Sequence, residues 1–391
     1  MNDHFPRWGR RSVLALAAGL LAAGAPVLAQ QNAPIRIGMI TDKVGPAKPY
    51  AEPVAAGAVY AVKELNAKGG ILGRPVELLV EDDQGRPDVS ATAARKLVDA
   101  GAAFILSVSL TPATQQAQNV TRETKTPHIT PSNSGDTLTT QIDNPNFWQT
   151  GPLGSTQIAT LLNYAASKNY KRVALVTDNS DLGQLTNKFF KAGIEKAGMQ
   201  VVAEEVVPRG STSAEAQMQK VRAANPDALF MTGVLTPENA LILRAYRQLG
   251  LKTPVLGNYN LSVPQTSSVA RGLLDGVVFV DAFDPEKPET QRFIEAFRKD
   301  SGTEPYNLNG YGYDGVMLVA DAIRRAGSTD KDKVREAMQA TKGWVGVMGA
   351  KGSSYGFPPG KRTGFDPNGM VVRVYEGDKQ GRVVHVGAGI K

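Results

Sequence analysis

Hydroxyl side chains follow two apolar segments in the first third of the chain, and their positions suit the binding of a small anion. The apolar run 104–106 has the pattern of a buried strand, and a second short strand is predicted at 128–130. The hydroxyl residues are Ser107, Ser109 and Thr111 after the first segment, and Ser132 and Ser134 after the second. Each hydroxyl can donate a hydrogen bond to a carboxylate. Two such loops in succession favour a binding site over simple turns.

Thr111 and Pro112 also mark the expected start of a helix that runs to Lys125. Proline is favoured at the first helical position, and the oxygen of a preceding threonine can cap the helix. A helix N-terminus carries unpaired N–H groups and a partial positive charge, both of which attract anions. The sequence therefore predicts a carboxylate site made of hydroxyl groups and one helix N-terminus.

The elements that position these loops alternate between strand and helix from Pro34 onwards. Before Gly151 the expected strands are 35–39, 76–80, 104–106 and 128–130. After it they are 172–177, 201–206, 228–232, 255–257 and 277–280, with helices near 158–167, 182–197, 214–224 and 238–249. This order predicts an α/β fold with parallel sheets covered by helices on both faces. No low-complexity linker separates the halves, so a short crossover near Gly151 is expected.

Composition excludes several classes of chemistry. The 391 residues are enough for two domains, and the chain contains no cysteine for disulfides or thiol catalysis. The three histidines, His4, His128 and His385, have no metal-ligand spacing, so no metal or cofactor is expected. The net charge is +7, but the basic residues are dispersed, which argues against nucleic-acid binding.

The first 29 residues have the pattern of an export signal. Arg7, Arg10 and Arg11 precede the apolar segment from Val13 to Leu28, and cleavage is expected near Ala29. The adjacent arginines leave the twin-arginine route open beside the general secretory route. The mature protein is therefore expected outside the cytoplasm.

Several segments together resemble one known family. They are 35–38 (IRIG), 66–75 (NAKGGILGRP), 81–83 (EDD), 129–132 (ITPS), 145–148 (PNFW), 224–227 (ANPD) and 313–314 (YD). The chain resembles the type I periplasmic binding proteins, specifically the leucine/isoleucine/valine-binding branch that serves ABC importers. The resemblance runs from about Ile35 to about Gly369, and segment 66–75 is its most specific part.

The resemblance implies a two-lobed α/β fold, in which each lobe is a parallel sheet flanked by helices and three crossovers form the hinge. Lobe 1 would combine residues 34–152 with 283–361, and lobe 2 would combine 153–282 with 362–391. It also implies a periplasmic, non-enzymatic protein that closes on a small carboxylate-bearing ligand and delivers it to an ABC permease in the inner membrane. We expect it to be a monomer.

The resemblance also assigns site residues. Thr111, Ser132 and Ser134 match the family's carboxylate-binding positions, Ser109 lies in the same group of hydroxyls, and Tyr50 matches an aromatic that lines the ligand side chain. Tyr259 stands where the family's amino-acid binders have a glutamate that pairs with the α-ammonium.

This departure bears on the ligand. Burying an ammonium without a counter-charge is costly, and a tyrosine hydroxyl cannot neutralise it. An aromatic or branched acid without an amino group is therefore favoured over leucine. Asp281, at the second crossover, or Asp136 could supply a displaced partner, which keeps an amino acid open as the ligand.

The sequence also bears on three other functions: dinucleotide binding, catalysis and sensing. Residues 310–315 satisfy G-x-G-x-x-G, but no apolar strand precedes them, so close helix packing is favoured over a dinucleotide site. An exported enzyme is a distant alternative, because no recognisable set of catalytic residues occurs. The nearer alternative is a sensor that presents its ligand to a receptor instead of a permease.

Overall fold

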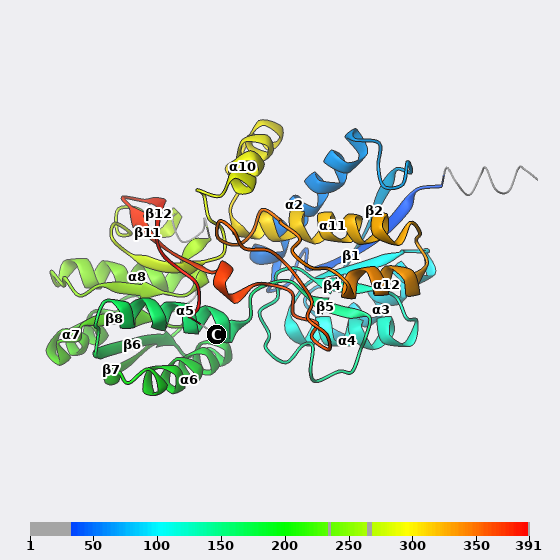
Figure 1. Ribbon diagram of the computed structural model, residues 1–391. Helices are drawn as coiled ribbons and strands as arrows, with labels where there is room; N and C mark the ends of the chain where they lie inside the picture. Colours follow the sequence, from blue (N-terminus) through cyan, green and yellow to red (C-terminus); the bar gives the residue numbers. More distant parts are fainter. Residues whose placement is uncertain (1–32, 234–235, 264–267, 390–391) are drawn as a thin grey trace, which may run out of the picture.

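The computed structural model describes residues 33–389, except 234–235 and 264–267, as two sheets surrounded by helices (Figure 1). The predicted export signal at residues 1–29 lies outside the described residues. The chain passes between the sheets three times: after β5, after β10 and before β11. These passages are the three crossovers of a two-lobed α/β fold.

The first sheet is entirely parallel and has the strand order β2-β1-β3-β4-β5. Its strands are β1 (Ile35–Thr41), β2 (Val76–Asp82), β3 (Phe104–Val108), β4 (His128–Thr130) and β5 (Phe147–Gln149). The helices around it are α2 (Lys48–Ala67), α3 (Pro87–Asp99), α4 (Thr111–Glu123), α10 (Pro288–Ser301), α11 (Asn307–Ala326) and α12 (Lys331–Gln339). The short strand at 128–130 is therefore confirmed at both ends.

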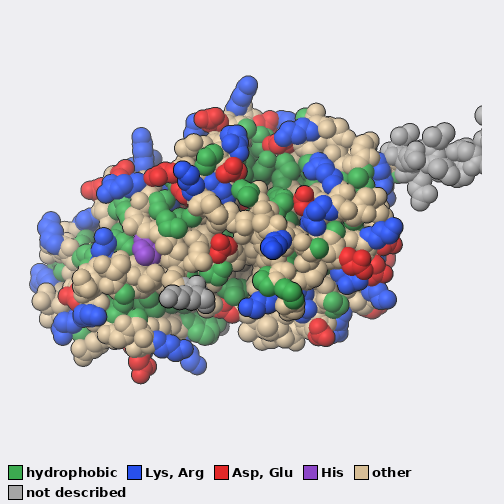
Figure 2. Space-filling model, viewed as in Figure 1, with side chains coloured by type: hydrophobic (Ala, Val, Ile, Leu, Met, Phe, Trp, Pro, Cys, Tyr) green, Lys and Arg blue, Asp and Glu red, His purple; other side chains and the backbone are tan. Residues whose placement is uncertain are grey.

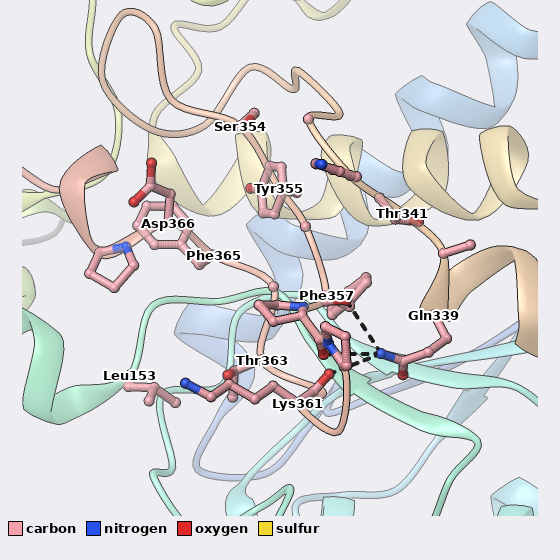
Figure 3. A pocket seen from close by; sticks show the side chains of 18 of the residues that line it. Leu153, Gln339, Thr341, Ser354, Tyr355, Phe357, Lys361, Thr363, Phe365 and Asp366 are labelled. Carbon is pink, nitrogen blue, oxygen red and sulfur yellow. Dashed lines mark hydrogen bonds between the residues drawn. The ribbon is translucent and has the colours of Figure 1, made fainter. Parts of the chain in front are cut away.

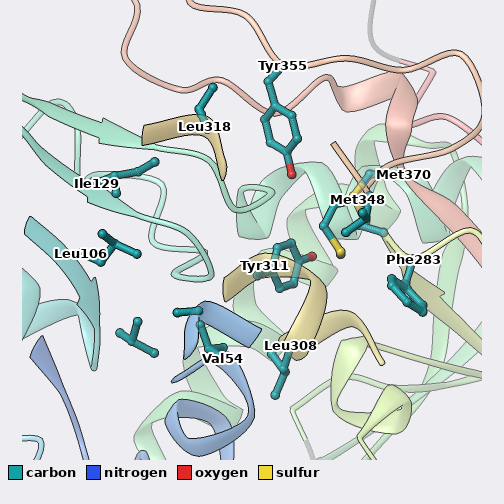
Figure 4. Packing of buried hydrophobic residues seen from close by; sticks show 14 of the residues in the cluster. Val54, Leu106, Ile129, Phe283, Leu308, Tyr311, Leu318, Met348, Tyr355 and Met370 are labelled. Carbon is teal, nitrogen blue, oxygen red and sulfur yellow. The ribbon is translucent and has the colours of Figure 1, made fainter. Parts of the chain in front are cut away.

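Alternation of side chains along the strands explains why helices cover both faces of this sheet. Leu106 of β3 packs in the cluster that contains Val54 of α2 and Leu318 of α11 (Figure 4). The preceding residue, Ile105, packs in a separate cluster with residues of α3 and α4. Successive strand residues point to opposite faces, so an apolar run such as 104–106 requires cover on each side.

The second sheet has the order β12-β11-β10-β9-β8-β6-β7. Its strands are β6 (Arg172–Asp178), β7 (Gln200–Val207), β8 (Ala228–Met231), β9 (Val255–Gly257), β10 (Val278–Asp281), β11 (Val371–Glu376) and β12 (Lys379–Val386). The accompanying helices are α5 (Gly154–Ser167), α6 (Asp181–Lys196), α7 (Glu215–Ala224), α8 (Thr236–Gln248) and the short η1 (Tyr259–Ser262). β6 to β10 are parallel, whereas β11 and β12 form an antiparallel pair at one edge.

The prediction that Thr111 caps α4 is wrong. The N-cap residue is Leu110, and Thr111 and Pro112 are the first two residues of the helix. The Thr111 hydroxyl donates instead to Asn133 Oδ1, 3.0 Å away in the loop after β4. The threonine therefore connects two loops and does not cap its own helix.

The glycines of the G-x-G-x-x-G segment lie inside α11 and serve helix packing, as expected. A Cβ atom added to Gly312 would lie 1.8 Å from the Val54 carbonyl oxygen, and one added to Gly57 would lie 1.9 Å from that of Asn309. Only glycine allows α2 and α11 to approach this closely. The segment is therefore a helix contact.

Charged side chains of both signs are interspersed over the face of the molecule in Figure 2. This distribution agrees with the dispersed charges of the sequence. Among the described residues, the helices are too short or too polar to cross a membrane.

His128 is the first residue of β4 and is 0% exposed. Its Nε2 and Nδ1 atoms lie 2.6 and 3.0 Å from the hydroxyl oxygens of Ser107 and Thr121. Burial lowers the pKa of His128 from 6.5 to about 3. The unfolded chain binds a proton below pH 6.5 that the folded protein does not bind until about pH 3, so acidification favours unfolding.

We therefore expect the free energy of unfolding to fall as the pH drops below about 6.5, with His128 contributing up to about 1.4 kcal/mol per pH unit. Chemical denaturation of the wild type and of His128→Gln, at pH 7 and pH 5, measures this contribution. The variant should lose part of the pH dependence, whereas His385→Gln, at a half-buried site, should lose less. An equal pH dependence in the wild type and His128→Gln would contradict the assignment.

Candidate functional site

Asn133 joins the two loops that follow β3 and β4. Its Oδ1 accepts hydrogen bonds from the Thr111 hydroxyl and the Gly135 N–H, each at 3.0 Å, and its Nδ2 donates to the Ser109 carbonyl at 3.2 Å. The Asn133 carbonyl in turn accepts from Gln149 Nε2 at 2.8 Å. The loop geometry is thus fixed by one side chain that the sequence does not distinguish from an ordinary turn asparagine.

The Ser109 hydroxyl is directed into the first lobe. Its oxygen is buried and lies beside the Asp83 carboxyl, which is also fully buried. Burial raises the pKa of Asp83, and the neighbouring Ser109, Gly85 and Ser90 partly offset that rise. Ser109 therefore contributes to the support of the loop through Asp83 and through its carbonyl group.

A small cavity of about 20 Å³ lies where residues of the two sheets and the crossovers meet. Its wall includes Ser132 and Ser134 from the loop after β4, Tyr259 of η1, Asp281 at the end of β10, and Asn307 and Tyr311 of α11. A volume of this size holds about one water molecule. A solute of amino-acid size therefore requires these walls to move apart.

Tyr259 and Tyr50 meet across this region. Their ring centroids are 6.5 Å apart with an interplanar angle of 64°, an edge-to-face contact. Asn258 fixes the start of η1, because its Oδ1 accepts from the Asn260 N–H at 3.0 Å. Burial raises the pKa of both tyrosines, so both are neutral at physiological pH. The pair offers ring surfaces and hydroxyl groups but no charge.

Asp281 lines the cavity, but its charge is already compensated. Arg373 Nη1 lies 3.1 Å from one carboxylate oxygen, and the other accepts from Asn307 Nδ2 at 2.9 Å and from the Ala282 N–H at 2.7 Å. Burial raises the pKa of Asp281, and these three donors counteract the rise. A ligand ammonium would compete with Arg373 for this carboxylate.

Asp136 is also engaged, and it does not line the cavity. Its carboxylate accepts from the Ser155 hydroxyl at 2.6 Å and from the Ser155 N–H at 3.2 Å, in the first turn of α5. This arrangement compensates the N-terminus of α5. Neither proposed substitute for the missing glutamate is thus free of partners.

The structure brings Ser132, Ser134, Tyr259 and Asp281 together around one cavity, and Tyr50 contacts this group through Tyr259. Ser109 lies in the loop after β3 and Thr111 is the first residue of α4, and neither lines that cavity.

Sequence reasoning did not identify Gln157, Asn307 or Tyr311, the other polar side chains of the lining, whose remaining residues are Pro152, Ala282, Leu308 and Met370. Asn307 and Tyr311 are four residues apart on one helix face next to a crossover. That spacing is the feature of the sequence that could have identified both residues as lining one site.

The family model described as "Periplasmic binding protein" matches residues 34–364. The Leu/Ile/Val-binding protein homolog 3 of Brucella melitensis is 30% identical over 302 residues, which cover 76% of this chain and 81% of the relative. The leucine-, isoleucine-, valine-, threonine- and alanine-binding protein of Pseudomonas aeruginosa is 26% identical over 336 residues, covering 85% and 89% of the two chains.

Solved structures show the same fold. A leucine-binding protein from Thermotoga maritima superimposes with a TM-score of 0.74 at 24% identity, over 90% of this chain and 98% of that chain. The branched-chain amino acid binding protein of Streptococcus pneumoniae in complex with isoleucine gives 0.76 at 23% identity, over 90% and 99%. Both structures match nearly the whole described chain.

Proposed function

The chain belongs to the periplasmic binding protein family, and on this basis we propose that it captures a small carboxylate-bearing solute between its lobes and delivers it to an ABC importer. The observation that carries the proposal is the interlobe cavity, where Ser132 and Ser134 face Tyr259. The protein would act in the periplasm after removal of a signal cleaved near Ala29.

The proposed lobes are residues 34–152 with 283–361, and residues 153–282 with 362–391. The separation into two sheets supports this division, because β1 to β5 form one sheet and β6 to β12 form the other. The contact of α11 with α2 supports the assignment of the segment after Phe283 to the first lobe. Opening at the three crossovers would enlarge the small cavity enough to admit a solute.

The proposed ligand is an aromatic or branched acid without an α-ammonium group. Ser132 and Ser134 supply hydroxyl donors suited to a carboxylate, while Tyr50 and Tyr259 supply ring surfaces. Tyr259 has no charge to pair with an ammonium, and Arg373 already compensates Asp281. Relatives named for branched-chain amino acids support the size of the solute, and the proposed difference lies in its amino group.

A thermal-shift screen of acids and amino acids on the purified mature protein tests this proposal. Stabilisation rises with the ratio of ligand concentration to Kd, so the true ligand should give the largest shift. A set of matched pairs, such as leucine with its 2-oxo acid and phenylalanine with 3-phenylpropanoate, separates the two classes of ligand. No shift with any acid would contradict the proposal.

Ser132→Ala and Ser134→Ala should each weaken binding of that ligand by roughly 1–3 kcal/mol, because each removes a hydrogen bond to a charged group. Thr111→Ala should weaken it through loosening of Asn133. Calorimetry measures the three affinities. Thr140→Ala, an exposed change in the same loop, is the control and should bind normally. Normal binding by all three test variants would place the site elsewhere.

A further inference from the structure

A second and much larger cavity, about 700 Å³, lies outside the cleft and against the crossovers; we call it the hinge pocket (Figure 3). Its wall includes Leu153 from the first crossover and Thr156 from α5. It also includes Phe357 and Lys361 from the loop between α12 and the third crossover, and Phe365 from that crossover. Cavities of 300–1,000 Å³ are typical of small-molecule sites, which occur preferentially between domains.

The hinge pocket and the cleft cavity share a wall. Leu153 and Thr156 line the hinge pocket, whereas their neighbours Pro152 and Gln157 line the cleft cavity. The first and third crossovers are also joined, since the Gln149 N–H donates to the Arg362 carbonyl at 2.8 Å and the Gly364 N–H donates to the Gln149 carbonyl at 2.9 Å. The same segments therefore separate two cavities and form two parts of the hinge.

The interior of the hinge pocket is mainly apolar. Phe357, Phe365 and Leu153 provide its largest apolar side chains, and Pro358, Pro359 and Pro367 add to them. Gln339 Nε2 donates to the carbonyl groups of Phe357, Pro358 and Lys361 at 3.2 to 3.4 Å, as the dashed lines in Figure 3 show. These bonds hold the loop that forms one side of the pocket, so the apolar surface is formed in advance.

The charge at the rim is positive. Lys342 and Lys361 line the pocket, are exposed, and form no ion pair within the described part of the chain. The lining also contains one acidic residue, Asp366, whose carboxylate accepts a hydrogen bond from the Asn368 N–H at 2.9 Å, so the net charge of the lining is positive. An apolar interior with two unpaired ammonium groups at its rim complements a molecule with an apolar body and one negative charge.

We propose that the hinge pocket is a second ligand site for an aromatic or branched apolar molecule with one anionic group, and that its occupancy changes the affinity of the cleft. The lining residues at 339–343 and 354–359 belong to the first proposed lobe, whereas Leu153, Thr156 and Asp366 belong to the second. Rotation of the lobes therefore changes the shape of the pocket. A ligand that prefers one shape shifts the hinge equilibrium, and by linkage the two sites alter each other's affinity equally.

Binding at the hinge pocket is tested with 8-anilinonaphthalene-1-sulfonate, which has an aromatic body, one sulfonate and fluorescence that increases in apolar surroundings. The mature wild-type protein, without any cleft ligand, should bind it saturably at one site. Leu153→Asp should weaken binding by roughly fivefold or more, because it places a negative charge in the pocket. Leu153 is the N-cap of α5, where aspartate is favoured, so this variant should fold.

Matched variants locate the probe. Lys342→Glu/Lys361→Glu should weaken binding by roughly fivefold or more, whereas Lys351→Glu, an exposed change in the same connection but outside the pocket, should not. Ser132→Ala/Ser134→Ala should leave probe affinity unchanged. Sensitivity to the serine pair with no response to the lysine pair would place the probe in the cleft and overturn the site. No saturable binding up to about 1 mM would also overturn it.

The coupling rests on the proposed function and is measured separately. The affinity of the cleft ligand found by thermal shift should change by roughly fivefold or more when the probe saturates the hinge pocket. This change should disappear in Leu153→Asp. An unchanged cleft affinity overturns the coupling while the second site stands. Absence of any cleft ligand would instead count against the proposed function, because probe binding is measured without one.

Discussion

Replacement of Arg373 by leucine is expected to lower the free energy of unfolding by about 3–5 kcal/mol, because it leaves a buried carboxylate without its counter-charge. Arg373 is 4% exposed and Asp281 is 2% exposed, and they form the 3.1 Å ion pair between β11 and the end of β10. Arg373 also donates to the side chain and carbonyl of Gln380, at 3.1 and 2.9 Å. Equilibrium denaturation in urea measures the loss.

Two further variants distinguish the effect of the unpaired buried charge on stability from the effect of lost side-chain packing. Arg373→Leu/Asp281→Leu should regain much of the stability, because it removes the isolated charge together with its partner. Arg382→Leu removes the exposed pair with Glu376, whose side chains are 67% and 52% exposed, and should change stability by less than about 1 kcal/mol. A loss in Arg373→Leu no larger than in Arg382→Leu would contradict this role.

Tyr259→Glu is expected to reverse the ligand preference of the protein. In the wild type, an amino acid should bind roughly 100-fold more weakly than its deaminated analogue, because its ammonium loses water without gaining a counter-charge. In the variant, the new carboxylate pairs with the ammonium of an amino acid. An acid without an amino group offers that carboxylate no counter-charge, and its own negative charge is repelled, so it should bind more weakly. Calorimetry with leucine, phenylalanine and their deaminated analogues gives the order of affinities in the wild type and in the variant.

Tyr259→Gln is the matched control for this reversal, since glutamine resembles glutamate in shape but has no charge. It should not restore amino-acid binding. Tight binding of leucine or phenylalanine by the unmodified protein would refute the proposed ligand class. In that case Asp281 or Asp136 would have to exchange its present partner for the ammonium.

Local periodicity explains how much of the fold could be predicted. The strands at 104–106 and 255–257 follow from short apolar runs bounded by turn residues, which are properties of neighbouring residues. The start of α4 was misplaced by one residue, because the partner of Thr111 is Asn133, 22 residues away. A hydrogen bond to a distant loop overrides the local capping preference.

The site was harder to predict for the same reason. Ser132 and Ser134 could be selected because loops at the ends of parallel strands meet at one sheet edge. The charge state of the cavity could not, since Asp281 and Arg373 are 92 residues apart and meet only when the final strands join the second sheet. Tyr311 lies within the G-x-G-x-x-G segment, and only the packing of α11 shows that it reaches the cavity.

Small-angle X-ray scattering of the mature protein, with and without the acid that gives the largest thermal shift, tests the central claim most directly. Capture between two lobes predicts that saturating ligand reduces the radius of gyration, because the lobes rotate together about the three crossovers. Ser132→Ala/Ser134→Ala at the same ligand concentration should show less compaction. An unchanged radius in the wild type, at a concentration that calorimetry shows to be saturating, would contradict capture by hinge closure.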